Sequence, residues 1–286
     1  MEYLLLALTA VACTFQNIFK KKFNQTSGGG VFCFTSVVAC FAMLCFIAIN
    51  RYWIFDAELL LPAGAFALSY AATTVFNVLA IKHGSLAKTS LIISCSLLVP
   101  SIFGILFLDE PFSITLVIGI VTLITSLVMI NYKKKKDNEK KTTVKWVIFS
   151  AIAFLGNGMC STVQKIETFI YGTEGKNLFM IFALAMVSII MMIFAMSSKN
   201  ERKFCKSSLK LGIHWAVLCG VTNGVVNCLT VYLNPVMPAS VMYPVISAGS
   251  IVLTFIYSII CLKEKFSAWQ KLGFLLGVIS IILLNL

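Results

Sequence analysis

The chain has 286 residues, of which 59% are hydrophobic and only 12% are charged. A soluble domain carries roughly 25% charged residues, so this composition excludes most soluble folds. The mean hydropathy of +0.94 and apolar runs of about 20 residues instead indicate helices that cross a bilayer. The net charge of +12 falls in short lysine clusters between the apolar runs, which is typical of membrane topology signals and not of nucleic-acid binding.

Apolar windows bounded by charged or turn residues predict ten transmembrane helices. In chain order they cover 2–19, 31–50, 59–81, 85–108, 112–132, 146–166, 177–197, 210–233, 238–262 and 266–286. No basic stretch precedes the first window, so we predict a membrane span there and not a cleaved signal peptide. The polar segments 133–145 and 197–210 are predicted to be loops, and the glycines at 28–30 a flexible turn.

Groups that carry out catalysis or bind metals are absent from the sequence pattern. The ten cysteines form no C-x-x-C pair, and eight lie in or beside apolar runs, so we interpret them as small hydrophobic side chains. We find no Ser-His-Asp set, no phosphate-cradling glycine loop and no His/Cys cluster with metal-ligand spacing. The sequence therefore predicts no enzyme activity, no cofactor and no metal site.

The two halves of the chain resemble each other. Segment 108–130 aligns without a gap to segment 262–284 at a constant offset of 154 residues. The matched pairs are Leu108/Leu262, Glu110/Glu264, Phe112/Phe266, Ser113/Ser267, Gly119/Gly273 and Ser126/Ser280. Further pairs, at slightly smaller offsets, are Asn77/Asn227 and Gln16/Gln164. Transporters are often built from duplicated halves, so the match indicates an internal repeat.

This repeat divides the chain into three predicted parts. Residues 1–132 form a first five-helix repeat, residues 133–145 a basic cytoplasmic linker, and residues 146–286 a second five-helix repeat. Because five is odd, the second repeat must enter the membrane from the opposite side. The predicted fold class is an all-α polytopic membrane protein with two inverted repeats.

The distribution of basic residues predicts the orientation in the membrane. The loops after the odd-numbered predicted spans, together with the first residues of the spans that follow them, hold 20 of the 23 basic residues, and the positive-inside rule places such segments on the cytoplasmic side. Both termini are then outside. The turn at 109–111, predicted outside, is acidic, whereas its repeat partner at 263–265, predicted inside, is basic.

Several motifs resemble the EamA-type branch of the drug/metabolite transporter superfamily. A span ends in Glu, followed by Phe-Ser and a glycine-bearing final span, at both 110–119 and 264–273. Gly156-Asn157-Gly158 with Gln164-Lys165, and Tyr243-Pro244-Val245, also resemble family motifs. The Trp-Gly that is usual in span 1 is absent, because the chain reads Cys13-Thr14-Phe15-Gln16-Asn17 there.

This resemblance implies helices arranged around a central cavity with alternating access. Spans 3, 4, 8 and 9 and parts of spans 1 and 6 would face inward. Export is favoured over import on the resemblance alone. The small multidrug resistance branch carries a carboxylate in the middle of its first span, and this chain has none there. We therefore expect a neutral, zwitterionic or anionic substrate.

Polar stripes along the predicted spans indicate where a substrate would bind. A polar side chain inside a bilayer needs a partner, water or a ligand, and amides recur in equivalent spans of both halves. The predicted substrate-binding residues are Gln16, Asn77, Asn157, Ser161, Gln164, Lys165, Asn223, Asn227, Tyr243 and Ser247. For the Ser and Thr hydroxyls, helix-to-helix hydrogen bonding is the simpler interpretation. For Lys165, anchoring at the outer interface competes with contact to a substrate anion.

The sequence as a whole predicts a plasma-membrane secondary transporter of a small polar metabolite. Its partners would be that metabolite and the lipid bilayer, and the chain would act as a monomer or weak homodimer. Two glycine pairs, Gly220/Gly224 and Gly273/Gly277, would mark either dimer faces or close packing within one chain. A membrane-embedded lipid-modifying enzyme and a non-transporting interaction subunit or channel are the alternatives.

Overall fold

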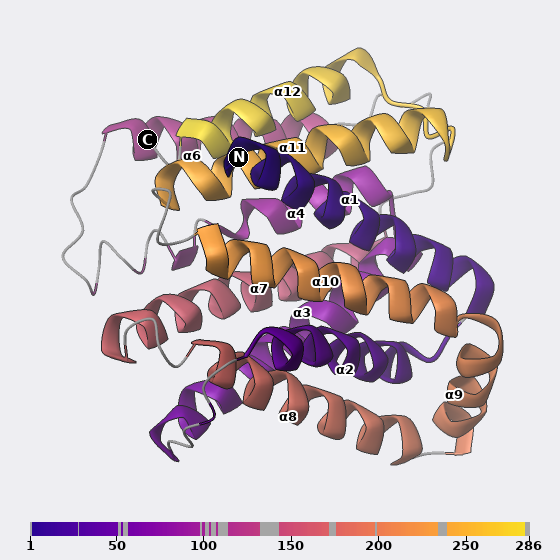
Figure 1. Ribbon diagram of the computed structural model, residues 1–286. Helices are drawn as coiled ribbons and strands as arrows, with labels where there is room; N and C mark the ends of the chain where they lie inside the picture. Colours follow the sequence, from indigo (N-terminus) through magenta and orange to yellow (C-terminus); the bar gives the residue numbers. More distant parts are fainter. Residues whose placement is uncertain are drawn as a thin grey trace.

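Most of the described residues of the protein are helical. The computed structural model describes residues 2–27, 29–50, 53, 57–97, 99–100, 103, 107, 114–131, 143–171, 176–197, 199–233 and 239–283, and within these ranges no strand occurs. Most helices run side by side across the view of Figure 1. The all-α fold class is therefore confirmed for this part of the chain. Most of the predicted linker at 133–145 and the turn at 109–111 lie outside it.

The helices follow the predicted spans closely. Those of the first half are α1 Glu2–Ser27, α2 Val31–Ile49, η1 Ala57–Leu59, α3 Leu60–His83, α4 Leu86–Ser94, η2 Cys95–Leu97 and α6 Ile114–Asn131. Those of the second half are α7 Val144–Tyr171, α8 Lys176–Ser197, α9 Lys199–Leu211, α10 Ile213–Leu233, α11 Ala239–Ile260 and α12 Ala268–Leu283.

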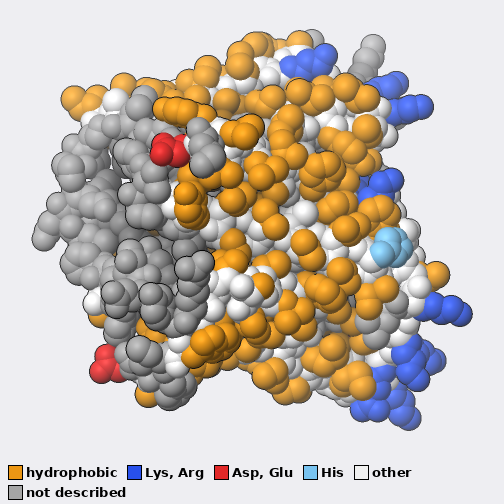
Figure 2. Space-filling view, viewed as in Figure 1, with side chains coloured by type: hydrophobic (Ala, Val, Ile, Leu, Met, Phe, Trp, Pro, Cys, Tyr) orange, Lys and Arg blue, Asp and Glu red, His pale blue; other side chains and the backbone are white. Residues whose placement is uncertain are grey.

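Six helical segments of the described chain are long and apolar enough to cross a membrane. They are Glu2–Ser27, Val31–Ile49, Ala57–His83, Val144–Gln164, Asn177–Ser197 and Ile213–Thr230, and a shorter apolar helix covers Ile246–Ile260. Figure 2 shows the hydrophobic side chains that cover the middle of the molecule, as a lipid-facing surface requires. The count of ten spans stays a prediction.

Two predicted boundaries are wrong. The first span was expected to end at residue 19, with a loop at Lys20–Lys22, but α1 continues to Ser27. Lysine has a high helix propensity and nothing in the run breaks a helix, so the chain turns only at the glycines. There Gly30, the N-cap residue before α2, has φ 79°, a left-handed conformation that glycine adopts without steric cost.

The segment 197–210 is not the predicted loop but contains the helix α9. The segment is polar in composition, but its helix has one apolar face. On this face Cys205 is 4% exposed and packs with Cys33 of α2 and Ala195 of α8. The basic residues of α9 are exposed; the helix lies at the right-hand edge of Figure 1, at the end of the molecule where Figure 2 shows blue side chains. A helix with one docked face and one charged face is what an interfacial position favours.

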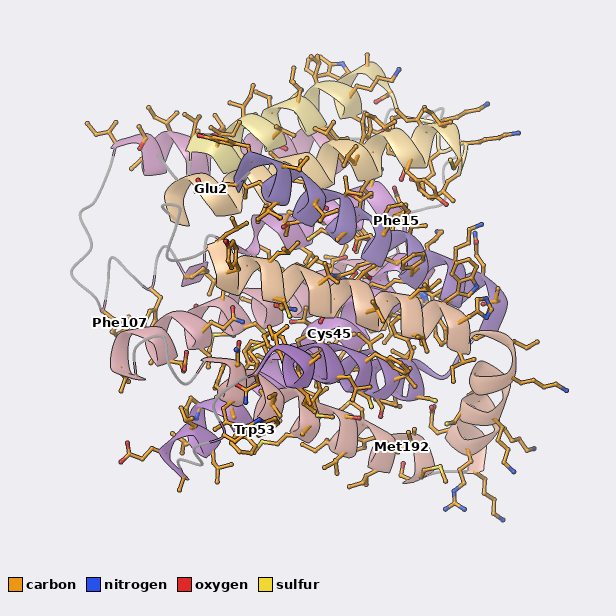
Figure 3. All side chains as sticks on the ribbon, in the orientation of Figure 1. Glu2, Phe15, Cys45, Trp53, Phe107 and Met192 are labelled. Atoms are coloured by element: carbon orange, nitrogen blue, oxygen red, sulfur yellow. The ribbon has the colours of Figure 1, made fainter. Side chains whose placement is uncertain are left out.

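Packing joins the two halves of the chain throughout. Helix α3 lies against α7 and α8, α2 against α8 and α10, α1 against α10 and α11, and α6 against α12. The largest buried apolar cluster is shared by α2, α3, α7 and α8. The outer face of α8 is exposed, with Met192 projecting from it in Figure 3. The halves are therefore interleaved and not stacked as separate bodies.

Both glycine pairs serve packing within the chain. A Cβ placed on Gly220 would lie 2.7 Å from the Cβ of Phe41, and one on Gly224 would lie 2.5 Å from the Sγ of Cys45, so α10 approaches the backbone of α2 closely. Figure 3 shows Cys45 between these two helices. In the other pair, the carbonyl of Gly273 accepts from Ser126 Oγ at 2.7 Å, which joins α12 to α6.

Candidate functional site

A cluster of polar side chains joins α1, α3 and α10 inside the apolar body. Asn223 is its centre: its Nδ2 donates to Gln16 Oε1 at 3.4 Å, and its Oδ1 accepts from the Tyr70 hydroxyl at 3.0 Å. Asn227 Nδ2 donates to the Asn223 carbonyl at 2.8 Å and to its Oδ1 at 3.2 Å. We call Gln16, Tyr70, Asn223 and Asn227 the amide cluster.

Local sequence explains why these groups meet. Asn223 and Asn227 are four residues apart, so they occupy one face of α10. The glycines of the same helix occupy a neighbouring side and lie against α2, while Asn223 meets Gln16 of α1 and Tyr70 of α3. Gln16 and Tyr70 are each less than a tenth exposed, whereas both asparagines are only half-buried. The cluster therefore combines two enclosed side chains with two asparagines that solvent or a ligand can partly reach.

The hydroxyl of Tyr70 also connects the cluster to α7. It lies near the Thr74 hydroxyl of its own helix and near the thiols of Cys219 on α10 and Cys160 on α7. Cys219 in turn contacts the carbonyl of Gln16, with its Sγ at 3.9 Å. Tyr70 thus stands where helices from both halves of the chain come together.

Asn77, two turns beyond Tyr70 on α3, is buried with an unsatisfied acceptor. It is 4% exposed, and its Oδ1 finds no hydrogen-bond partner among the described residues. Leaving a buried acceptor unpaired costs about 1–3 kcal/mol. Such a group is a place where water or a ligand donor would be favourable.

Three predicted residues on α7 hydrogen-bond elsewhere. Asn157 Nδ2 donates to Ser96 Oγ of η2 at 2.7 Å, and Gln164 Nε2 contacts Met180 Sδ of α8 at 3.5 Å. Ser161 donates to the carbonyl of Asn157 in its own helix. The structure thus brings Gln16, Asn223 and Asn227 into direct contact, while Asn157 and Gln164 have other partners.

The remaining predicted residues are only partly described. The side chains of Lys165 and Tyr243 lie outside the described part of the structure. Ser247 is half-buried on α11. Their role in binding stays a prediction.

Sequence reasoning missed Lys20 as a member of this region. Lys20 was assigned to a cytoplasmic loop because it begins a run of three lysines, yet it is 9% exposed and its charge lies near Cys13 and Cys219. The available signal was its spacing, since Lys20 follows Gln16 by four residues and shares its helix face.

Beyond Lys20, an apolar cluster closes the space between the helices. Phe23 of α1 and Phe34 of α2 are each 1% exposed, with ring centroids 4.3 Å apart, and they pack with Val78 and Cys219. Asn24 Nδ2 donates to the Val78 carbonyl at 2.8 Å. The amide cluster is therefore sealed on this side by α1, α2, α3 and α10.

The charged side chains divide between the two ends of the helices. In Figure 2 the Lys and Arg side chains gather at the right-hand end, where α1 ends, α9 lies and α11 turns into α12. Acidic side chains appear at the other end, where Figure 3 labels Glu2. Within the described residues no group of three or more His, Cys, Asp or Glu side chains could hold a metal ion.

Taken together, the described residues form an all-helical, largely apolar body with a buried polar cluster, which is typical of a polytopic membrane protein. Residues 1–132 match the model of the EamA-like transporter family. This match supports the resemblance predicted from the motifs for the first half of the chain.

A solved structure titled only "Crystal structure of protein" superposes with a TM-score of 0.56 at 12% identity, covering 97% of this chain and 98% of its own. This likeness shows a shared fold over nearly the whole chain. A search of curated proteins gives no match.

Proposed function

We propose that the protein is a secondary transporter that moves a small polar metabolite across the plasma membrane by alternating access, in the direction of export. The observation that carries the proposal is the amide cluster, because its members come from α1, α3 and α10 and so from both halves of the chain. Amides both donate and accept, as a neutral or zwitterionic ligand requires. Polar groups inside a membrane-spanning body are rare and often mark a functional site.

Helix pairing supports an inverted repeat. If α1, α2, α3, α4 and α6 correspond to α7, α8, α10, α11 and α12, the contacts of one half recur in the other. The pair α3·α7 then corresponds to α10·α1, α2·α10 to α8·α3, and α1·α11 to α7·α4, while α2·α8 and α6·α12 are their own counterparts. Such a pseudo-twofold relation permits the two halves to exchange inward- and outward-facing arrangements.

The orientation is proposed from charge. The basic end of Figure 2 is assigned to the cytoplasm and both termini to the outside. The seal at Phe23 and Phe34 then lies on the cytoplasmic side of the amide cluster. A substrate would reach the cluster from the cytoplasm only after this seal separates.

Ligand-induced stabilisation of the purified protein is the first test. A ligand that binds only the folded state raises the unfolding temperature, so amino acids, quaternary amines, nucleosides and sugars are screened by thermal unfolding. Hits are then tested for uptake into proteoliposomes. We expect Asn223→Ala to abolish both responses.

The matched control is Thr222→Val. Its hydroxyl bonds only to carbonyls of its own helix, Leu218 and Cys219, so both responses should survive. Equal behaviour of the two variants would reject the amide cluster as the binding site.

A further inference from the structure

Lys20 places a cation inside the helical body. It is 9% exposed, one turn from Gln16 along α1, which corresponds to about 6 Å of axial rise. Its ammonium interacts electrostatically with the thiols of Cys219 on α10 and Cys13 on α1. The side chain therefore lies near both thiols, and Cys219 itself contacts the carbonyl of Gln16 in the amide cluster.

This ammonium has no counter-charge in the described part of the chain. We find neither a hydrogen bond nor an ion pair to it there, in contrast to the buried Lys88, which has an interaction partner. Burying an isolated ammonium is expensive, and buried charges are normally paired. Thiols are weak acceptors and do not replace a carboxylate.

From these observations we infer that Lys20 binds the anionic group of the transported substrate, a carboxylate or a phosphate. The inference rests on the proposed transport function and specifies its substrate class. The anion pairs with the Lys20 ammonium, while a polar group about one helical turn away meets Gln16, Asn223 and Asn227. A small hydroxy acid, amino acid or sugar phosphate has these two features at that separation.

The first test is a ligand titration of the purified full-length protein in a neutral detergent. Succinate, glutamate and inorganic phosphate are compared with succinamide and choline by thermal unfolding. We expect at least one anion to stabilise the protein and succinamide and choline to have no effect. Lys20→Met should weaken the anion response tenfold or more, since a charged hydrogen bond is lost, and Lys20→Arg should retain most of it.

Lys22→Met is the matched control, because it removes the same charge from the same helix at a half-buried position. It should leave the anion response unchanged. Equal loss in both variants would mean that overall charge, and not Lys20, attracts the anion, and would overturn the inference.

A second measurement does not depend on knowing the ligand. In a variant that keeps Cys13 and replaces the other nine cysteines, an anionic and a cationic methanethiosulfonate compete for the thiol. Thiolate formation affects both reagents equally, so their rate ratio reports the local field. The anionic reagent should react faster, and Lys20→Met should remove this preference.

The outcomes separate the two proposals. Stabilisation by a neutral or cationic ligand that Lys20→Met does not affect would overturn the anion inference and leave the transport function standing. If Cys13 reacts with neither reagent and no ligand stabilises the protein, the anion inference and the proposed transport function are both overturned. A phospholipid retained at Lys20, seen by native mass spectrometry without any response to soluble anions, would assign the ammonium to a lipid headgroup and overturn the inference.

Discussion

At the scale of single residues, Tyr70 is the side chain that holds the amide cluster together. Its hydroxyl donates to Asn223 Oδ1, the same oxygen that accepts from Asn227. Through this bond the phenol fixes the amide so that its Nδ2 faces Gln16. Rigid polar groups bind a ligand with less loss of conformational entropy than mobile ones.

Replacing this hydroxyl tests its positioning role. Tyr70→Phe should lower the free energy of unfolding by about 0.5–1.5 kcal/mol and weaken ligand binding, because Asn223 loses its restraint. Thermal unfolding with and without ligand measures both effects. Tyr232→Phe, at a position 58% exposed on α10, is the control. If binding by Tyr70→Phe equals that of the control, the hydroxyl does not position the cluster.

Individual site residues were predictable where helical spacing made them visible. Asn223 and Asn227 were found because amides are rare in apolar runs and their spacing gives one face. Their partner Gln16 was found for the same reason, although the repeat suggested Gln164 as an equal, and Gln164 instead meets Met180. Lys20 was missed because a lysine cluster at the end of an apolar run is ordinarily a topology signal.

At the scale of helices, the α2–α10 contact depends on glycine. Gly220→Ala should destabilise the protein by about 1–3 kcal/mol, because the added methyl overlaps Phe41 and the backbone of Val38. Gly64→Ala is the control, since a Cβ there meets nothing within 4 Å. Both changes raise helix propensity equally, so the difference between their unfolding temperatures isolates the overlap. Equal temperatures would show that α10 does not approach α2 this closely.

Helix α4 is tied to the other half of the chain by a carboxylate. Glu264, in the turn between α11 and α12, accepts from Ser85 Oγ at 2.6 Å and from the Leu86 amide at 3.4 Å. Ser85 is the N-cap of α4, so the carboxylate also lies at the positive end of the helix dipole. Glu264→Gln keeps the length of the side chain and removes its negative charge, so this variant tests the contribution of the charge alone.

We expect Glu264→Gln to lower the free energy of unfolding by about 0.5–2 kcal/mol. Combined with Ser85→Ala, the loss should be smaller than the sum of the two single losses, because both remove the same contact. Lys265→Gln, an exposed change in the same turn, should have little effect. If the two losses of unfolding free energy add exactly in the double variant, Glu264 and Ser85 do not stabilise the fold through a shared contact.

Helix positions were predicted well and the polar connections poorly. The window 31–50 became α2 at Val31–Ile49 because bilayer thickness sets the length of an apolar run. The helix α9 was missed because its apolar face is short, and the change from α4 to the 3-10 turn at Cys95–Leu97 has no counterpart in the hydropathy. Both features depend on neighbours distant in sequence.

At the scale of the whole molecule, the separation of charge predicts the topology. Cys261 is exposed at the basic end, and Trp53 is 60% exposed at the other; Figure 3 shows Trp53 away from the basic end. In intact cells, a membrane-impermeant thiol reagent should label Trp53→Cys in a background without other cysteines. A variant keeping only Cys261 should be labelled only after the membrane is permeabilised. The reverse pattern would invert the orientation.

The interleaving of the halves has a consequence for the synthesis of the protein. Gln16 enters the membrane first, but its partner Asn223 is 207 residues later in the chain, a delay of about 10–40 s at ordinary rates of translation. During this interval α1 carries an unpaired amide and the Lys20 ammonium in contact with lipid or with the insertion machinery. Truncated or slowly translated chains therefore leave these polar groups exposed for longer, and Gln16 gains its partner only when α10 is in place.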